Sequence, residues 1–187
     1  MALTTERLEQ KLRERFASVA IERQMGDAVR DHTLIVPAES LVEICTFLRD
    51  DRELEFAMLT WMGGADYMPR APRFETIYNL LSLTQNLRIT LKVRLPEESL
   101  KVSSVVGVWP TANWHERETY DFYGIDFVGH PDLTRILLPE DWIGWPLRKD
   151  SPLGYEEVAF THNTPNRKLP SPSLKKLAPK KVKYRAQ

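Results

Sequence analysis

The chain has 187 residues, of which 42% are hydrophobic and 28% charged, and its 26 basic and 26 acidic residues give a formal net charge of zero. This length and composition are typical of a soluble globular protein with one domain and extensions. No apolar run approaches the roughly 20 residues of a membrane-spanning helix, so no such helix is expected. Cys45 is the only cysteine, which excludes a disulfide framework and a thiolate metal site and favours a reducing, cytosolic compartment.

Charge is distributed unevenly along the chain. All 26 acidic residues lie at or before Glu157, whereas eight of the 26 basic residues lie between positions 162 and 187. An acidic body therefore precedes a basic, proline-rich tail that is too polar to form its own core. The tail could bind nucleic acid or anionic lipid through its charge. Tyr184 is its only aromatic residue, so the favoured interpretation is an arm that wraps an acidic partner and orders on binding.

Two amphipathic helices are predicted in the first 50 residues. Residues 4–16 predict a helix with Thr5 as its cap and a narrow apolar stripe, made by Leu8, Leu12 and Phe16. Residues 39–50 predict a second helix, with a stripe at i, i+3, i+4 and i+7 made by Leu41, Ile44, Cys45 and Leu48. Cys45 is therefore expected in the core, where apolar burial raises the pKa of a thiol and makes it unreactive.

Strands are predicted between and after these helices, at residues 19–21, 29–36, 54–62, 73–83 and 87–95. The first two are expected to form a hairpin with a turn at positions 26–27, and the last two a hairpin with a turn at 84–86. Residues 87–95 alternate apolar and polar side chains along their whole length, which predicts a sheet with one wet face. Residues 97–108 include a possible short helix, closed by Pro110.

A further helix is predicted from Asn113 to Gly124. Asn113 is expected to be its N-cap, with Glu116 completing a capping box, and Gly124 to end it in the left-handed conformation. Four side chains share one face of this helix: Trp114, Arg117, Glu118 and Asp121. Charges beside a tryptophan indicate a hydrogen-bonded ionic network at a packed surface.

After Gly124 the chain is expected to be extended over residues 125–128 and then irregular. Long irregular segments cost more ordering entropy than their own contacts offset, so another surface, such as another protein, is expected to hold this one. The order of elements predicts an α+β domain over residues 1–128, with a mostly antiparallel sheet and helices packed on one side. Residues 129–187 are expected to form a long irregular C-terminal extension, with the basic tail from about residue 162.

Motifs for catalysis or cofactor binding are absent or incomplete. His115 and Glu116 begin an HExxH pattern, but Thr119 stands where the second zinc ligand is needed. Glu116, Glu118 and Asp121 could include a general acid–base pair, although ion pairs with Arg117 and another basic residue are the favoured interpretation. His130 is expected to be a turn residue whose ring bonds to backbone or to a carboxylate, with a catalytic role as the alternative.

Two motifs resemble a known family. The first consists of Glu116, Arg117, Glu118, Asp121, Gly124, His130, Pro131, Arg135, Ile136 and Leu137, and the second of Gly144, Pro146, Leu147, Arg148, Lys149 and Asp150. In this order they are similar to the signature of the 30 kDa subunit of proton-pumping NADH:quinone oxidoreductase, respiratory complex I. The match covers about residues 109–152. Thr134 departs from the pattern, where the family usually has a basic residue, and so does Ser151, where it often has an aromatic one.

The resemblance implies a structural subunit of the hydrophilic arm with no catalytic, cofactor-binding or metal-binding residues of its own. FMN and iron–sulfur clusters would lie in partner subunits, and the chain would pack on the 49 kDa subunit near the quinone-reducing region. It would be peripheral, on the cytoplasmic side of a bacterial inner membrane. The residues expected at subunit interfaces are Trp114, Glu116, Arg117, Glu118, Asp121, Gly124, His130, Pro131, Arg135, Pro146, Leu147, Arg148, Lys149 and Asp150.

Two alternatives remain open. Related ferredoxin- or deazaflavin-linked dehydrogenases and membrane hydrogenases have similar subunits, so the electron donor is not fixed by the motifs. A protein of another class, a nucleic-acid or lipid-binding module that uses the basic tail, is the second alternative.

Overall fold

The computed structural model describes residues 5–24 and 32–151. The predicted turn at positions 26–27 and the basic tail lie outside the described residues. The elements are, in chain order, α1 (Thr5–Arg15), β1 (Glu22–Gln24), β2 (His32–Ile35), the 3-10 helix η1 (Ala38–Ser40), α2 (Leu41–Asp50), β3 (Met58–Asp66), β4 (Phe74–Ser82), β5 (Leu87–Leu95), β6 (Lys101–Ser103), α3 (Ala112–Tyr123) and β7 (Asp126–Val128).

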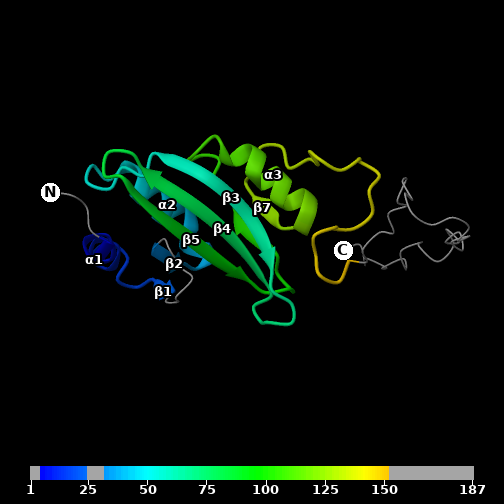
Figure 1. Cartoon of the computed structure of the whole chain (residues 1–187), viewed down its shortest axis with the longest axis horizontal. Helices are drawn as coiled ribbons and strands as arrows, with labels where there is room; N and C mark the ends of the chain where they lie inside the picture. The colour runs from blue at the N-terminus through cyan, green and yellow to red at the C-terminus, as the bar shows by residue number, and fades with distance from the viewer. Residues whose placement is uncertain (1–4, 25–31, 152–187) are drawn as a thin grey trace, which may run out of the picture.

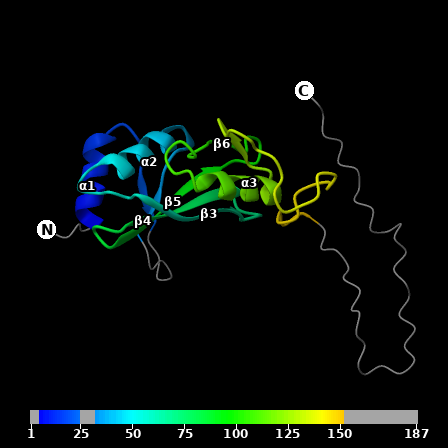
Figure 2. The same ribbon diagram turned by 90° about the horizontal axis from the view of Figure 1, so that it is seen from above.

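A five-stranded sheet in the order β1-β2-β5-β4-β3 forms the centre of the fold (Figure 1). Its neighbours are antiparallel except for β2 and β5, which are parallel. A second, two-stranded sheet pairs β6 with β7 in parallel. Figure 2 shows α1 and α2 on one side of the long strands and α3 along β3. The predicted α+β class, with a mostly antiparallel sheet and helices on one side, is therefore confirmed.

The core lies between the sheet and the helices, and the sequence periodicity explains why. The inward side chains of β5 that alternate with polar ones, Ile89, Leu91, Val93 and Leu95, are all buried. They meet the two apolar stripes of α1 and α2, which are also buried. Cys45 belongs to the second stripe, and burial raises the pKa of its thiol, as expected of an unreactive core residue.

Several predicted boundaries are wrong. The strand predicted at 54–62 begins four residues later and continues through Gly63 and Gly64 to Asp66, because Leu54 and Phe56 are buried in the turn that precedes it. The first strand lies at Glu22–Gln24 instead of 19–21. No helix forms over residues 97–108, since the chain there pairs as β6 with β7.

The start of α3 also differs from the prediction. The helix begins at Ala112 with Thr111 as N-cap and no capping side chain, so Asn113 lies inside the helix and Glu116 is free to point into the core. Residues 129–151, here called the extended segment, follow β7 as irregular backbone. The proposed division of the chain after residue 128 stays a prediction, although the extended segment contacts the preceding domain along its length, as described below.

Candidate functional site

The C-terminal end of α3 holds the extended segment through a glycine and a tryptophan. Gly124 has φ 71°, and its N–H donates to the Tyr120 carbonyl at 2.8 Å, which confirms the predicted helix end. A Cβ at this position would overlap the Trp145 ring. That ring packs edge-on against Tyr120, with 5.2 Å between centroids, and the Arg135 guanidinium lies 4.8 Å from its centroid. Glycine is therefore required here both by its backbone conformation and by the close approach of Trp145.

Asp121 is the group that shapes the first half of the extended segment. Its carboxylate is fully buried, and Oδ1 accepts from Arg135 Nη1 at 2.7 Å. Oδ2 accepts from three successive backbone amides, those of Ile136 at 3.1 Å, Leu137 at 2.8 Å and Leu138 at 2.9 Å. Burial alone would raise the pKa of Asp121, but these amides and the guanidinium lower it below its ordinary value. An ion pair of Asp121 with a basic residue other than Arg117 is therefore present, and its partner is Arg135.

Arg117 does not pair with the carboxylates of its own helix. Its Nε donates to the Thr134 carbonyl at 3.1 Å, and its Nη2 donates to the Thr134 hydroxyl at 3.0 Å and to the Arg135 carbonyl at 3.2 Å. The ion pairs expected for Arg117 with its neighbours on α3 are therefore wrong. The irregular backbone at positions 134 and 135 directs both carbonyls at the guanidinium, and Thr134, a departure from the family pattern, adds a hydroxyl acceptor.

Trp114 lies open at the surface of the chain, and its expected place at a packed subunit interface stays a prediction. Its side chain is 59% exposed, and the Arg117 guanidinium lies 5.5 Å from its ring centroid. Glu118 is half-buried on the same helix. The face expected to form an ionic network thus divides in two: Asp121 is enclosed by the extended segment, while Trp114 faces outward.

Glu116 points into the domain and joins α3 to the chain after β6. Its Oε2 accepts from the Ser104 hydroxyl at 2.6 Å, and its Oε1 from the Val105 amide at 2.7 Å. Burial raises the pKa of Glu116 to about 7, although these two hydrogen bonds act in the opposite direction. The predicted capping box and ion pairs of Glu116 are wrong, because the side chain turns inward to satisfy Ser104 and Val105.

His130 is a turn residue, as predicted. Its Nδ1 accepts from the Asp132 amide at 3.0 Å, so the ring proton belongs on Nε2, which faces the Asn113 carbonyl at 3.2 Å. Nε2 also lies 4.0 Å from Glu116 Oε2, and both side chains are fully enclosed. This pair has no open path to a substrate, which argues against acid–base catalysis by these groups.

Two groups that no sequence motif indicates, Asp66 and Arg73, hold the far end of the extended segment. Arg73 and Asp66, on either side of the β3–β4 loop, form a buried bidentate pair with N···O distances of 2.9 and 2.8 Å. Asp66 Oδ2 also accepts from the Lys149 amide at 2.8 Å, and Arg73 Nη2 donates to Asp150 at 2.7 Å. Burial alone would raise the pKa of Asp66, but its hydrogen bonds with Arg73 and with amides lower it strongly. Arg148 donates from Nε to the Tyr123 carbonyl at 2.7 Å.

Asp150→Asn tests how much the exposed ion pair between Asp150 and Arg73 contributes to holding the extended segment. The Asp150 side chain is 52% exposed, whereas Asp66 and Arg73 are buried. Exposed ion pairs contribute at most about 1 kcal/mol, so we expect the free energy of unfolding, measured by urea denaturation, to fall by less than about 1 kcal/mol. A much larger loss would mean that Asp150 holds the segment, and not the Asp66–Arg73 pair.

Large apolar side chains on and beside the extended segment point outward. The exposed ones are Trp114, Val128, Leu137, Trp142, Ile143 and Leu147. Ile143 is 77% exposed, although the backbone on either side of it is fixed by Asp121 and by Trp145. Ordered backbone that presents apolar side chains to the exterior is typical of a protein-binding surface. We call these six residues the apolar contact set.

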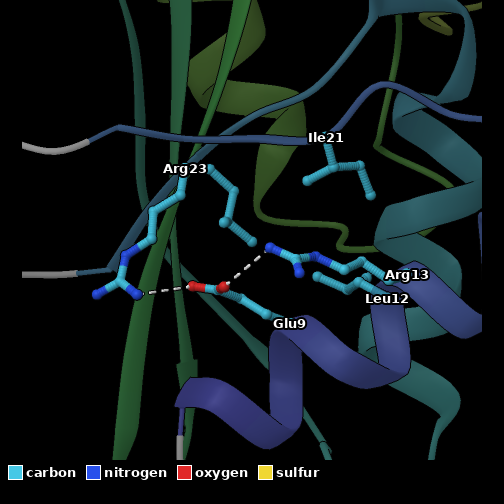
Figure 3. A pocket seen from close by; sticks show the side chains of 6 residues that line it. Glu9, Leu12, Arg13, Ile21 and Arg23 are labelled. Carbon is cyan, nitrogen blue, oxygen red and sulfur yellow. Dashed lines mark ion pairs between the residues drawn. The ribbon is translucent and has the colours of Figure 1, made fainter.

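Two hollows lie outside this region among the described residues. One, of about 340 Å³, is open at the β3–β4 loop and is lined by residues 68–73 and 96–98. The other, between α1 and the β1–β2 edge, is lined by Glu9, Leu12, Arg13, Ile21, Arg23 and Leu34 (Figure 3). Its volume of about 20 Å³ admits one water molecule, and Glu9 is already paired with Arg23 at 3.2 Å and Arg13 at 3.6 Å. Within residues 5–24 and 32–151, no three potential ligand side chains gather into a metal site, and none of the helices is long and apolar enough to cross a bilayer.

The fold and the two motifs define a family. The model of the family described as "Respiratory-chain NADH dehydrogenase, 30 Kd subunit" matches residues 34–157, and the chain belongs to this family. The chain is 56% identical over 133 residues to the NADH-quinone oxidoreductase C subunit of Roseiflexus sp., with 71% of this chain and 76% of that one covered. It is 47% identical over 156 residues to the protein of the same name from Herpetosiphon aurantiacus, with 83% and 89% covered. The resemblance of the motifs is thereby confirmed.

Solved structures agree with this assignment. A trypsin-resistant fragment of Nqo5 superposes with a TM-score of 0.55 at 33% identity, covering 67% of this chain and 98% of that one. A chain of the membrane-bound sulfane sulfur reductase, an archaeal respiratory membrane complex, superposes with a TM-score of 0.61 at 20% identity, covering 79% and 85%. The second likeness shows the fold alone.

Proposed function

We propose that this chain is the structural 30 kDa subunit of a bacterial NADH-quinone oxidoreductase, in the hydrophilic arm of respiratory complex I. The observation that carries the proposal is membership of the family over residues 34–157, with NADH-quinone oxidoreductase relatives at 47–56% identity. In this function the chain keeps neighbouring subunits in the geometry that electron transfer from NADH to quinone requires, and that transfer is coupled to proton translocation.

The geometry supports a structural function more than a catalytic one. The charged residues of the two motifs largely bond within the chain, where Asp121 fixes the first half of the extended segment and Arg148 and Asp150 attach its far end. What remains at the surface is the apolar contact set, and we propose that it packs on the 49 kDa subunit near the quinone-reducing region. Redox groups, FMN and iron–sulfur clusters, belong in this proposal to partner subunits, and the chain is peripheral on the cytoplasmic side of the inner membrane.

A second candidate is the equivalent subunit of a related complex that uses ferredoxin, a deazaflavin or hydrogen in place of NADH. The fold is similar to that of a chain of the sulfane sulfur reductase, so the same fold occurs in another respiratory membrane complex. This similarity supports the second candidate. Purification of the tagged chain from its native membrane, followed by assay of the complex with NADH and quinone, distinguishes the two. NADH oxidation supports the first candidate, and activity only with another donor supports the second.

Ile143→Asp tests the apolar contact set directly. A charge in place of a side chain that docks in an apolar pocket of a partner costs more than about 1 kcal/mol, so we expect at least about fivefold less of the variant to remain in the membrane complex after a salt wash. Leu83→Asp is the matched control, because Leu83 is 68% exposed and lies in the turn between β4 and β5. Equal retention of the two variants and wild type would contradict this docking surface.

A further inference from the structure

The sheet has a second surface that the extended segment does not use. Side chains of β3, β4 and β5 that alternate with the buried ones point away from the helices and form what we call the outer face. Its apolar part lies at the β3 edge and consists of Met58, Trp61, Ile77 and Leu81. Met58 is 46% exposed and Trp61 43% exposed, so an apolar strip along two strands, interrupted on β4 by Asn79, is open to the surroundings.

The position of Trp61 is fixed by a glycine. The Trp61 ring lies against Gly63, two residues further along the same strand, where a Cβ would overlap its ring atoms. Gly63 is buried as a result, and the ring covers the sheet backbone beside Ile77. A large aromatic side chain held in one place, with little rotamer entropy left to lose, is typical of the anchor residues of protein interfaces.

The other part of the outer face carries an excess of positive charge. Glu75 is almost completely buried, and three cations surround its carboxylate: Arg70 at 2.6 Å, Arg94 at 3.5 Å and Lys92 at 3.8 Å. Glu22 adds one carboxylate, 3.7 Å from Arg94, while Arg88 is exposed beside Leu81. Three cations therefore surround two carboxylates, and Arg88 adds a fourth positive charge beside the apolar strip.

We propose that the outer face binds an amphipathic segment of a partner subunit, with apolar side chains on Met58 and Trp61 and carboxylates beside Arg88 and Lys92. The charge decides the occupant. The basic tail of this chain, with eight cations and no carboxylate after residue 162, would be repelled. A second copy would bring the same excess of positive charge to the contact, and like charges at an interface cost free energy. An acidic, partly apolar segment complements both parts of the face.

This inference rests on the proposed function, because it takes the partner from the same complex, but it concerns a different surface from the apolar contact set. Hydroxyl-radical oxidation followed by mass spectrometry, applied to the membrane complex and to the purified full chain, tests both surfaces at once. We expect Met58 and Trp61 to be oxidised several-fold more slowly in the complex than in the free chain. Trp142 reports the apolar contact set in the same experiment.

The outcomes separate the two proposals. Protection of Trp142 without protection of Met58 and Trp61 overturns the inference and leaves the proposed function in place. Failure of the chain to co-purify with a respiratory complex overturns the proposed function. Protection of Trp61 in the free chain at high concentration, together with a dimer in sedimentation experiments that Trp61→Glu abolishes, would assign the face to a second copy and overturn the inference.

Introduction of a negative charge on the outer face gives an independent measurement. Trp61→Glu and Arg88→Glu are each expected to reduce retention in the salt-washed complex by about tenfold, since each removes on the order of one anchor contact. Arg15→Glu is the matched control, because Arg15 is an exposed arginine at the end of α1, away from the outer face. Circular dichroism melting shows whether each variant is folded. If folded Arg88→Glu protein is retained as well as Arg15→Glu protein, the electrostatic part of the inference is wrong.

Discussion

Replacement of Asp121 by alanine is expected to lower the free energy of unfolding by about 3–5 kcal/mol, the cost of removing one partner of a buried ion pair. The variant leaves Arg135 without its carboxylate and three amides, those of Ile136, Leu137 and Leu138, without their acceptor. Buried donors that lose their acceptor keep the full penalty of leaving water. Urea denaturation measures the loss, and limited proteolysis is expected to cut first near residues 134–138.

The control for this prediction is Asp126→Ala. Asp126 is 49% exposed and lies 3.9 Å from Lys101, so its loss should cost less than about 1 kcal/mol. The pH dependence has a definite sign: the folded-state pKa of Asp121 is below its ordinary value of 3.8, so its stabilisation is present above that value and is lost as the pH falls through the folded-state pKa. An Asp121→Ala protein as stable as Asp126→Ala would contradict the role given to this carboxylate.

Glu116 is expected to give the wild-type stability the opposite dependence on pH, and Glu116→Gln is expected to remove it. Burial raises the folded-state pKa of Glu116 from 4.5 to about 7. Below pH 4.5 both folded and unfolded chains hold the proton, and between 4.5 and 7 only the folded chain does, so wild-type stability falls as the pH rises through this window. The loss is about 3 kcal/mol, because each pKa unit corresponds to about 1.4 kcal/mol. The glutamine amide keeps an acceptor for Val105 and a donor for Ser104 without any charge.

The measurement is the difference in free energy of unfolding between Glu116→Gln and wild type from pH 4 to pH 8. We expect the difference to rise in favour of the variant across the window and to be constant above it. Glu118→Gln, on the same helix, controls for the loss of one carboxylate from α3. Parallel curves for wild type and Glu116→Gln over the whole range would show that burial does not hold the proton on Glu116.

Local periodicity explains which parts of the fold the sequence predicted. The alternation over residues 87–95 and the stripe on α2 each depend on neighbours within one element, and both were confirmed. The end of α3 at Gly124 depends on one residue's conformational freedom and was also confirmed. The strand boundaries predicted at 54–62 and the helix predicted at 97–108 were wrong. The structure at both places depends on pairing with strands elsewhere in the chain, which no local pattern contains.

The sequence predicted where the candidate site lies along the chain, but not which groups its side chains bond to. Glu116 looks like a surface carboxylate in sequence, and only the approach of Ser104 and Val105 makes it a buried one. Arg73 meets Asp66 across a loop and Asp150 from much further along the chain, so no spacing rule could find the three together. The family motif marks the carboxylates that shape the extended segment, whereas the side chains left for a partner are the apolar ones between them.

Among the described residues, the groups that attach the extended segment to the domain precede it in the chain. Asp66, Arg73, Asp121 and Tyr123 all leave the ribosome before residues 129–151 do, and domains fold from the N-terminus as synthesis proceeds. The receiving groups are therefore in place when the segment emerges. A nascent or truncated chain that stops before this point displays no docking surface at residues 129–151, so assembly through that surface is restricted to chains whose translation has passed it.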